Sequence, residues 1–313
     1  MMNCNAAGSM KIIAIFAFAM LLFTATPALG QTSEQLSEDN QVRLGLSYDE
    51  SAMAISLVYG ASSSAAVTSF YTDILGLKRI RDIHTSTGNT LLRYRAGDSE
   101  LGFLLTPAKR PQFTGGVDAA YGVRMVAFLF PLEKKAKILK NLRTSGRKLP
   151  EFTSGRSARG YAFEYGMVYD NDDNQIELVF LDANAPLQRF QQIQIALSVS
   201  DLKKTQYFMR DVLGLIPRVD QGSMHRYELG NSQIKYLQKP PGLPSWVGTP
   251  DKKIGMMMIQ LPVSDLNAVI KKMHEYNVEI VREPFLMGGT TYMMFVRGPD
   301  GVIYEFIQYK REP

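Results

Sequence analysis

The chain has 313 residues, 45% of them hydrophobic and 21% charged, a composition that indicates a globular protein and excludes a disordered or fibrous one. Its length is that of two domains of ordinary size. The net charge of +5 and the pI of about 9.1 are mildly basic, and a single cysteine, Cys4, excludes an internal disulfide and a thiolate metal site.

Residues 1–30 have the pattern of a secretory signal peptide. Lys11 precedes the apolar run IIAIFAFAMLLF, and the small residues Ala28 and Gly30 fit cleavage after Gly30. The run is too short to span a bilayer as a mature helix, although an uncleaved anchor remains the alternative. We therefore expect a secreted or periplasmic protein with no stable membrane anchor.

The segment that follows, residues 31–50, is polar and unpatterned, and we expect a flexible lead-in. After it, the alternation of apolar and polar residues predicts one unit four times: a strand, a helix and three further strands. The first strands of the four units are expected at residues 54–60, 123–130, 193–199 and 254–261.

The helices of the first and third units carry clear end signals. Serines at residues 62–64, and Ser200 or Asp201, are expected to cap their starts, and Gly76 and Gly214 their ends. The helices of the second and fourth units are expected at residues 132–144 and 264–276. The first of these two holds the densest basic run, KKAKILKNLRTSGRK, which we interpret as a solvated helix face. Because export separates the chain from nucleic acid, we expect no nucleic-acid partner.

The last strands of the second and fourth units, residues 174–180 and 302–308, share an unusual feature. Each places a carboxylate, Glu177 or Glu305, among apolar residues. A charge inside a half-buried strand costs free energy unless another group pairs with it. The two strands therefore mark candidate sites.

The four units form two copies of one module. TSFYTDILGL matches TQYFMRDVLGL, RYRAGDSELGFLL matches RYELGNSQIKYLQ, and NDDNQIELVF matches GPDGVIYEFI, in the same order and about 130 residues apart. The domains predicted from this duplication are module one at residues 51–183, a linker at 184–190 and module two at 191–311.

The βαβββ unit, the helix end FYTDILGL and the closing strand NDDNQIELVF resemble the vicinal oxygen chelate superfamily. That superfamily includes glyoxalase I, bleomycin-resistance proteins and extradiol dioxygenases, the last of which are similar in having two modules in one chain. The resemblance covers nearly the whole mature chain and implies an α+β fold whose tandem repeats form two open barrels. One fold hosts many functions, so the chemistry is less constrained.

In metal-dependent members, each module holds a divalent ion with side chains from its first, fourth, fifth and last strands, usually histidines and a glutamate. The residues that align with these positions are, in module one, Ser56, Gly102, Met125 or Ala127, and Glu177, and in module two, Gln194, Lys235, Met256 or Met258, and Glu305. None is a histidine, so we predict no cofactor and disfavour a metal. If one bound, Gln194 and Glu305 would be its ligands. The three histidines, which we interpret as surface or packing residues, are His84, His225 and His274.

Lys235 is informative, because it brings a positive charge to a position that the resemblance assigns to a metal ligand. We expect it to pair with Glu305 across the cavity of module two, with Gln194 bonded to the carboxylate. Glu177 would then face Ser56 and a glycine. A shift of one residue in the alignment would instead turn the lysine out to solvent.

These features favour a metal-free protein that binds a small organic molecule in the module clefts. The residues expected to act on the ligand are Glu305, Lys235 and Gln194. The residues expected to contact it are Trp246, Met256, Met258, Glu177 and Ser56. Methionine adapts to irregular ligands, although core packing is the simpler interpretation of these methionines. Trp246 lies in the loop KPPGLPSWVGTP, where it either stacks on a ligand or anchors the loop.

The alternative is a lyase, isomerase or ring-cleaving dioxygenase of this superfamily, with a degenerate metal site that uses Gln194 and Glu305. A metal-free enzyme would need Glu305 or Glu177 as general base, with a pKa raised by burial. A scaffold that binds nothing is a third interpretation. The resemblance also leaves a homodimer open.

Overall fold

The computed structural model describes residues 55–85, 87–156, 161–185, 193–218, 225–230 and 232–309. The predicted signal peptide and the predicted lead-in lie outside these residues. Within them, no helix has the length and the apolar character that crossing a membrane requires.

Module one folds as two successive units of the predicted kind. The elements of the first unit are β1 (Ser56–Gly60), α2 (Ser64–Val67), the π-helical segment η2 (Thr68–Ile74), β2 (Lys78–His84), β3 (Thr90–Ala96) and β4 (Ser99–Leu105). The elements of the second are β5 (Gly122–Pro131), η3 (Leu132–Lys134), α3 (Lys135–Thr144), β6 (Thr153–Arg156), β7 (Ala162–Tyr169) and β8 (Gln175–Leu181).

Module two repeats this order. The elements of its first unit are β9 (Ile193–Val199), α4 (Leu202–Tyr207), η5 (Phe208–Val212), β10 (Ile216–Arg218), β11 (His225–Leu229) and β12 (Ser232–Gln238). The elements of its second are β13 (Gly255–Pro262), α5 (Leu266–Glu275), β14 (Ile280–Met287), β15 (Thr291–Arg297), η6 (Pro299–Gly301) and β16 (Ile303–Tyr309).

The predicted helix ends are confirmed. The Ser63 side chain accepts a hydrogen bond from the Ala66 N–H at the start of α2, and the Asp201 side chain accepts one from the Lys204 N–H at the start of α4. Gly76 and Gly214 follow the helices at φ angles of 72° and 66°, a left-handed conformation that glycine adopts without a steric penalty. The duplicated sequence therefore encodes duplicated local structure.

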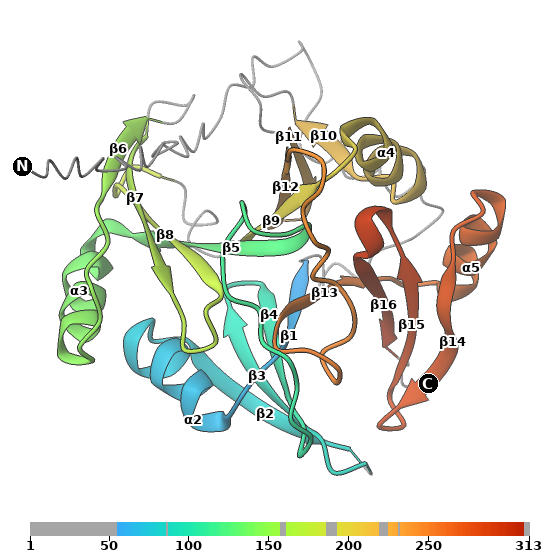
Figure 1. Cartoon of the computed structure of the whole chain (residues 1–313), viewed down its shortest axis with the longest axis horizontal. Coiled ribbons are helices and arrows are strands. Elements are labelled where there is room, and N and C mark those ends of the chain that lie inside the picture. The colour runs from blue at the N-terminus through green and yellow to red at the C-terminus, as the bar shows by residue number, and fades with distance from the viewer. Residues whose placement is uncertain are drawn as a thin grey trace, which may run out of the picture.

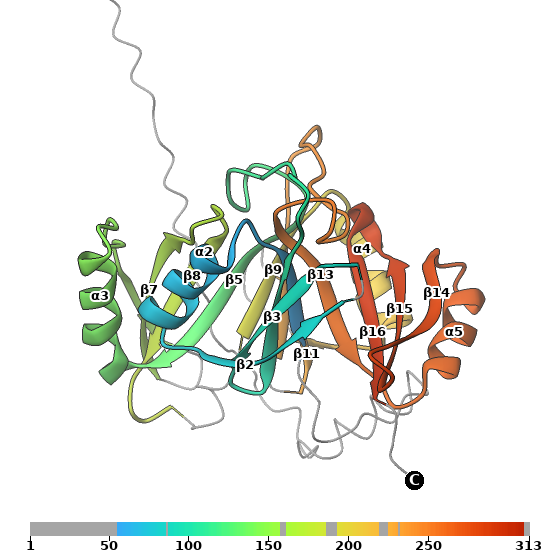
Figure 2. The same ribbon diagram turned by 90° about the horizontal axis from the view of Figure 1, so that it is seen from below.

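The strands form two curled, mixed sheets that are open half-barrels (Figures 1 and 2), as the α+β prediction requires. Sheet one has the order β14-β15-β16-β13-β1-β4-β3-β2, and sheet two has the order β10-β11-β12-β9-β5-β8-β7-β6. Each sheet thus joins the first unit of one module to the second unit of the other, because β1 pairs with β13 and β9 pairs with β5.

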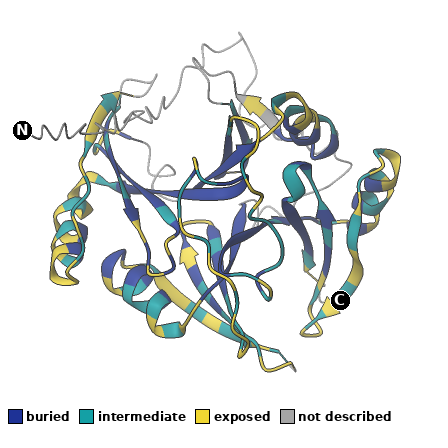
Figure 3. Ribbon diagram, in the orientation of Figure 1, coloured by how far each residue is buried: buried dark blue, intermediate teal, exposed yellow. Residues whose placement is uncertain are grey.

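One face of each sheet is covered by helices, which lie at the periphery of the molecule with buried strands between them (Figures 1 and 3). In sheet two, Ile176 and Leu178 of β8 pack in one core with Ile138 and Leu142 of α3. Side chains alternate between the faces of a strand, so Glu177 points to the opposite, helix-free face. We call this helix-free inner face the concave face of each sheet.

The two sheets meet along β5 and β13, and buried polar groups join them there. Asp170, in the turn before β8, accepts hydrogen bonds from Tyr71 Oη at 2.8 Å and from Asn174 Nδ2 at 2.9 Å. Asn174 Oδ1 in turn accepts one from the Met256 N–H at 3.2 Å. Burial raises the pKa of Asp170 to about 6. The turn that carries Asp170 and Asn174, just before β8, is therefore a joint between the sheets.

The loops that connect the units within each module also lie against each other at this joint. Isolated bridges link Gln112 to Ile254 and Tyr121 to Ser245. Figure 2 shows both loops on the same side of the molecule, above the central strands. The two modules are consequently interlocked by sheets and loops together.

Candidate functional site

Glu177 occupies the centre of a polar row on the concave face of sheet two. Its neighbour on β5 is Ala127, the neighbour of Ala127 on β9 is Gln194, and the neighbour of Gln194 on β12 is Gln233. Residues directly opposite each other on paired strands point to the same face. These four residues therefore form one line across four strands, which we call the sheet-two row.

A buried ion pair closes this row. The Lys235 ammonium lies 2.7 Å from Glu177 Oε2, and the two side chains are 2% and 0% exposed. The intervening strands carry Ala196, opposite Lys235, and Ala127, opposite Glu177. Their short side chains leave the path from β12 to β8 open for the long lysine side chain.

The predicted pairing of Lys235 with Glu305 is wrong. Glu305 lies in β16 of sheet one, whereas Lys235 lies in β12 of sheet two. The cause is that each sheet joins the first unit of one module to the second unit of the other. This arrangement brings the last strand of module one beside the first unit of module two. Gln194 does share a face with a carboxylate, but with that of Glu177 and without a hydrogen bond to it among the described residues.

Several atoms of the sheet-two row are buried and have no hydrogen-bond partner. They are both amide atoms of Gln194, Oε1 of Glu177 and Oε1 of Gln233. Within the described part of the chain, nothing satisfies them. Because more than nine in ten buried polar groups in proteins are hydrogen-bonded, this concentration on one face needs an explanation.

A cavity of about 720 Å³ lies beside β7, and none of the four row residues lines it. Its lining includes Met167 and Tyr165 of β7 and Gln175 of β8. Met167 is directly opposite Glu177, and Gln175 precedes Glu177 by two residues on the same face. Burial raises the pKa of Tyr165, and the charge of Glu177 adds to this effect. The cavity thus reaches the strand next to the buried carboxylate.

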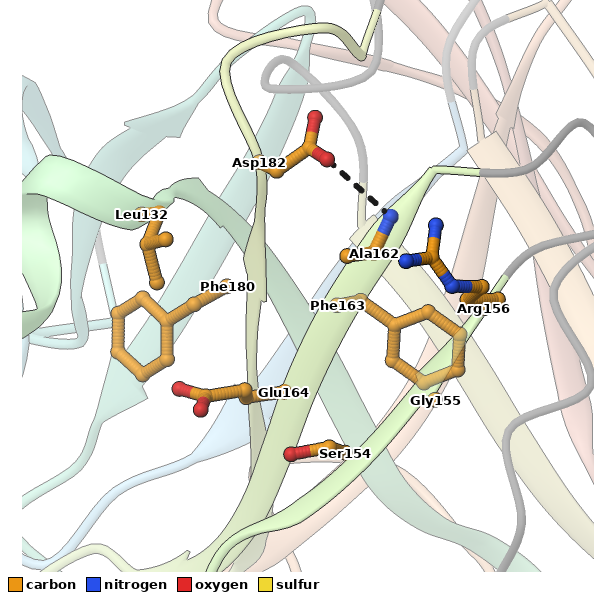
Figure 4. A pocket seen from close by; sticks show the side chains of 9 residues that line it. All are labelled: Leu132, Ser154, Gly155, Arg156, Ala162, Phe163, Glu164, Phe180 and Asp182. Atoms are coloured by element: carbon orange, nitrogen blue, oxygen red, sulfur yellow. Dashed lines mark hydrogen bonds between the residues drawn. The ribbon is translucent and has the colours of Figure 1, made fainter.

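A second cavity, of about 430 Å³, lies at the other end of β7 (Figure 4). There Asp182 accepts a hydrogen bond from the Ala162 N–H at 3.3 Å, and the absence of a side chain at Gly155 leaves room for the Phe163 ring. None of the predicted site residues lines this cavity.

Sheet one has an equivalent row with different chemistry. Glu305 is opposite Gln260 of β13, which is opposite Ser56 of β1. Ser56 Oγ accepts a hydrogen bond at 3.0 Å from the N–H of Glu100, on the neighbouring strand β4. We call Glu100, Ser56, Gln260 and Glu305 the sheet-one row.

The two carboxylates of the sheet-one row are in different environments. Gln260 Nε2 donates a hydrogen bond to Glu305 Oε2 at 3.0 Å. Arg93 donates two hydrogen bonds to the Glu100 carboxylate, one from Nε and one from Nη2, the latter at 2.8 Å. Burial raises the pKa of Glu305 to about 7, with a contribution from the charge of Glu100 and an opposing one from Gln260. Glu305 therefore exchanges a proton near neutral pH.

Neither row fits a tightly bound divalent ion. In sheet two, the Lys235 ammonium already contacts the carboxylate that a cation would need. In sheet one, Arg93 engages Glu100, and Gln260 directs an N–H to Glu305. The described residues contain no group of three or more metal-ligating side chains of the histidine, cysteine, aspartate or glutamate type. The predicted alternative ligands, Gln194 and Glu305, lie in different sheets, so that metal site is wrong.

The remaining predicted contact residues lie outside the rows. Met258 packs with Val58 and Ile303 on the concave face of sheet one, whereas Met256 belongs to the main core. Trp246 Nε1 donates to the Ile254 carbonyl at 3.2 Å, which is the loop-anchoring arrangement. Gly102 is opposite Val58, and it is Glu100 that lies beside Ser56 in the row.

The histidines are likewise outside the rows. His84 Nδ1 lies 3.1 Å from Thr90 Oγ1 on the exposed hairpin of β2 and β3. His225 stacks on Tyr236, with ring centroids 5.5 Å apart, and His274 is exposed on α5. These are the surface and packing positions that the sequence predicted.

Comparison with known proteins confirms the family resemblance. Residues 191–306 match the family model of the Glyoxalase/Bleomycin resistance protein/Dioxygenase superfamily. Glyoxalase I from Zea mays aligns at 17% identity and a TM-score of 0.58, over 81% of this chain and 91% of that chain. A protein from Bacillus subtilis, named as a candidate dioxygenase, aligns at 15% identity and a TM-score of 0.60, over 83% and 86%.

No curated protein matches the chain significantly in sequence. At the identities of the structural relatives, the similarity establishes the two-module fold and leaves the activity to be argued from the rows themselves.

Proposed function

We propose that this chain, whose second module matches the Glyoxalase/Bleomycin resistance protein/Dioxygenase superfamily, is an exported, metal-free protein that binds a small organic molecule on the concave face of sheet two. The observation that carries the proposal is the set of partnerless buried atoms on Gln194, Gln233 and Glu177. A folded protein loses stability by burying such atoms without partners, and a bound ligand that supplies their hydrogen bonds recovers that stability.

The Lys235–Glu177 pair supports the metal-free part of the proposal. It places a positive charge beside the last-strand carboxylate of the sheet-two row. A divalent ion at that carboxylate would meet the repulsion of the ammonium, or would have to displace a lysine that is buried and paired. The ion pair thus supplies the charge compensation that Glu177 needs.

The cavity beside β7 supports access to the row. Drug-sized ligands occupy clefts of about 300–1,000 Å³, and the cavity of about 720 Å³ is within that range. Its lining contains Met167 and Tyr165, which offer apolar surface next to the polar row. The N-terminal pattern of residues 1–30 supports the exported part.

The experiment is a thermal-melting screen of the full mature chain against a library of small organic molecules, with and without a metal chelator, together with metal analysis of the purified protein. The proposal expects at least one compound to raise the melting temperature equally in both conditions. A stoichiometric transition metal, or stabilisation that the chelator abolishes, would contradict it.

A second function, proton transfer at the sheet-one row, is favoured by one observation. Glu305 is 2% exposed and its pKa is raised to about 7, near the value that suits a general base at neutral pH. An enzyme of this kind would be a metal-free lyase or isomerase. Proton–deuterium exchange into a carbon acid, abolished by Glu305→Gln and retained by Gln238→Leu at an exposed position of β12, would establish it; no exchange above the solvent rate would reject it.

A further inference from the structure

Among the partnerless atoms of the sheet-two row, hydrogen-bond acceptors outnumber donors. Three of them are acceptors, the Oε1 atoms of Gln194, Gln233 and Glu177, and one is a donor, Nε2 of Gln194. The assignment of Gln233 is fixed by its neighbour, because Gln233 Nε2 donates to a carboxylate oxygen of Glu228 at 2.7 Å. The described row therefore presents an excess of acceptors.

From this excess we infer that the ligand of sheet two is rich in hydrogen-bond donors: a molecule that presents several N–H groups to the row, such as an amidine, rather than a carboxylate or a phosphate. The inference rests on the proposed function, since it names the class of ligand for the same site. A donor-rich group would satisfy the acceptors of Gln194, Gln233 and Glu177 together.

The lysine beside the row does not favour an anionic ligand. Lys235 is the cation nearest to Glu177, and its ammonium is already committed to the Glu177 carboxylate. An incoming carboxylate would set its lone pairs against three partnerless acceptors, and the row has one partnerless donor, the Gln194 amide. Two sets of acceptors that face each other in a buried site leave both unsatisfied.

The surroundings of the row indicate a ligand with a flat apolar body. Ala127 lies between Gln194 and Glu177 in the row and carries only a methyl group. On the same face, Met125, Ala196 and Met167 belong to one apolar cluster. Methionine side chains adapt their shape to planar groups. The ligand would lie over this cluster with its donors toward the row.

Three probes of nearly identical shape test the inference: benzamidine, benzamide and benzoate. The amidinium presents only donors, the amide presents both kinds of group, and the carboxylate presents only acceptors. Binding is measured by ligand-observed NMR and calorimetry on the full mature chain. We expect benzamidine to bind at least about tenfold more tightly than benzoate, with benzamide between them.

Two variants test whether the preference for benzamidine depends on the sheet-two row. Gln233→Leu removes one of the three acceptors without changing the charge, so the benzamidine preference should shrink severalfold. Gln238→Leu, on the same strand but exposed, should leave it unchanged. A circular dichroism spectrum and a melting curve for each variant establish that it is folded.

The outcomes separate this inference from the proposed function. Benzoate binding as tightly as benzamidine, or no binding of any of the three probes at millimolar concentration, contradicts the donor-rich inference. If the library screen nevertheless yields a ligand that a chelator does not displace, the proposed function stands. If the screen yields none, the proposed function itself fails.

Discussion

Lys235 and Glu177 lie 2.7 Å apart and come from different modules of the chain, 58 residues apart in sequence. Their contact exists only because β9 of module two pairs with β5 of module one. It therefore links the tertiary arrangement of the modules to the chemistry of one concave face. In a buried pair of this kind, each charge compensates the other. Removing one partner leaves the other charge uncompensated and lowers the free energy of unfolding strongly.

Breaking the pair is expected to destabilise the protein strongly. Lys235→Met leaves Glu177 buried and uncompensated, and should lower the free energy of unfolding by about 3–5 kcal/mol. The double variant Lys235→Met with Glu177→Leu removes both charges, and should recover most of that loss. Urea denaturation of the two single variants and the double variant measures the coupling. Additive losses would show that the two charges do not interact.

Replacing the partnerless amide is expected to have the opposite effect on stability. Gln194→Leu removes two buried polar atoms that have no partner in the described chain, so the free energy of unfolding should rise by about 1–3 kcal/mol. Gln238→Leu, the exposed control, should change it by less than about 0.5 kcal/mol. A destabilised Gln194→Leu variant would mean that the amide is satisfied in solution.

Stability is expected to fall as the pH rises toward neutrality. The folded pKa of Glu305, about 7, is above its ordinary value of 4.5, so its neutral form is favoured in the folded state. The contribution of Glu305 is fully present below about pH 4.5 and is lost as the pH rises through about 7, a change of about 3 kcal/mol. Asp170, with a pKa of about 6, contributes in the same direction.

Urea denaturation between pH 4 and pH 8 checks this behaviour. Glu305→Gln, which cannot ionise, should lose less stability than the wild type as the pH rises through about 7. The loss of stability that ionisation of Asp170 causes should remain in the variant. A wild-type profile that rises across this range and a variant that behaves identically would contradict the assignment.

Export is expected to remove the N-terminal segment. If residues 1–30 are a signal peptide, the mature protein begins at Gln31. Intact-mass spectrometry of the protein recovered from the periplasm or the medium measures this directly, with the cytoplasmic fraction as the control. A chain that retains Lys11 in the exported fraction would identify an uncleaved anchor instead.

Local structure was predictable from the sequence, whereas the pairing of units was not. The βαβββ units, the caps at Ser63 and Asp201, and the last-strand carboxylates all follow from short-range patterns. The duplication itself makes it hard to predict that each sheet combines units of both modules. The reason is that β5 and β13 have similar patterns, so either can serve as the partner of β1. Which edge pairs with which is decided by long-range packing, and Lys235 was consequently assigned the wrong carboxylate.

The position of Gln260 was missed for a related reason. The repeats AFLFPLEKKAKIL and MIQLPVSDLNAVI match with Pro131 on Pro262, which makes Met258 the equivalent of Ala127. The register places Gln260 there, because β5 has two residues more than β13 between its first glycine and its proline. Counting from Gly122 and Gly255 would have identified Gln260 from the sequence.

Binding of a ligand by the sheet-two row without a metal can be measured on the melting temperature. The most direct measurement is the ligand-induced change in melting temperature of the wild type and of Gln194→Leu, both in the presence of a chelator. We expect a shift of several degrees for the wild type that is largely lost in the variant, although the unliganded variant is the more stable. Equal shifts in the two proteins would place the ligand elsewhere and reject metal-free binding at the sheet-two row.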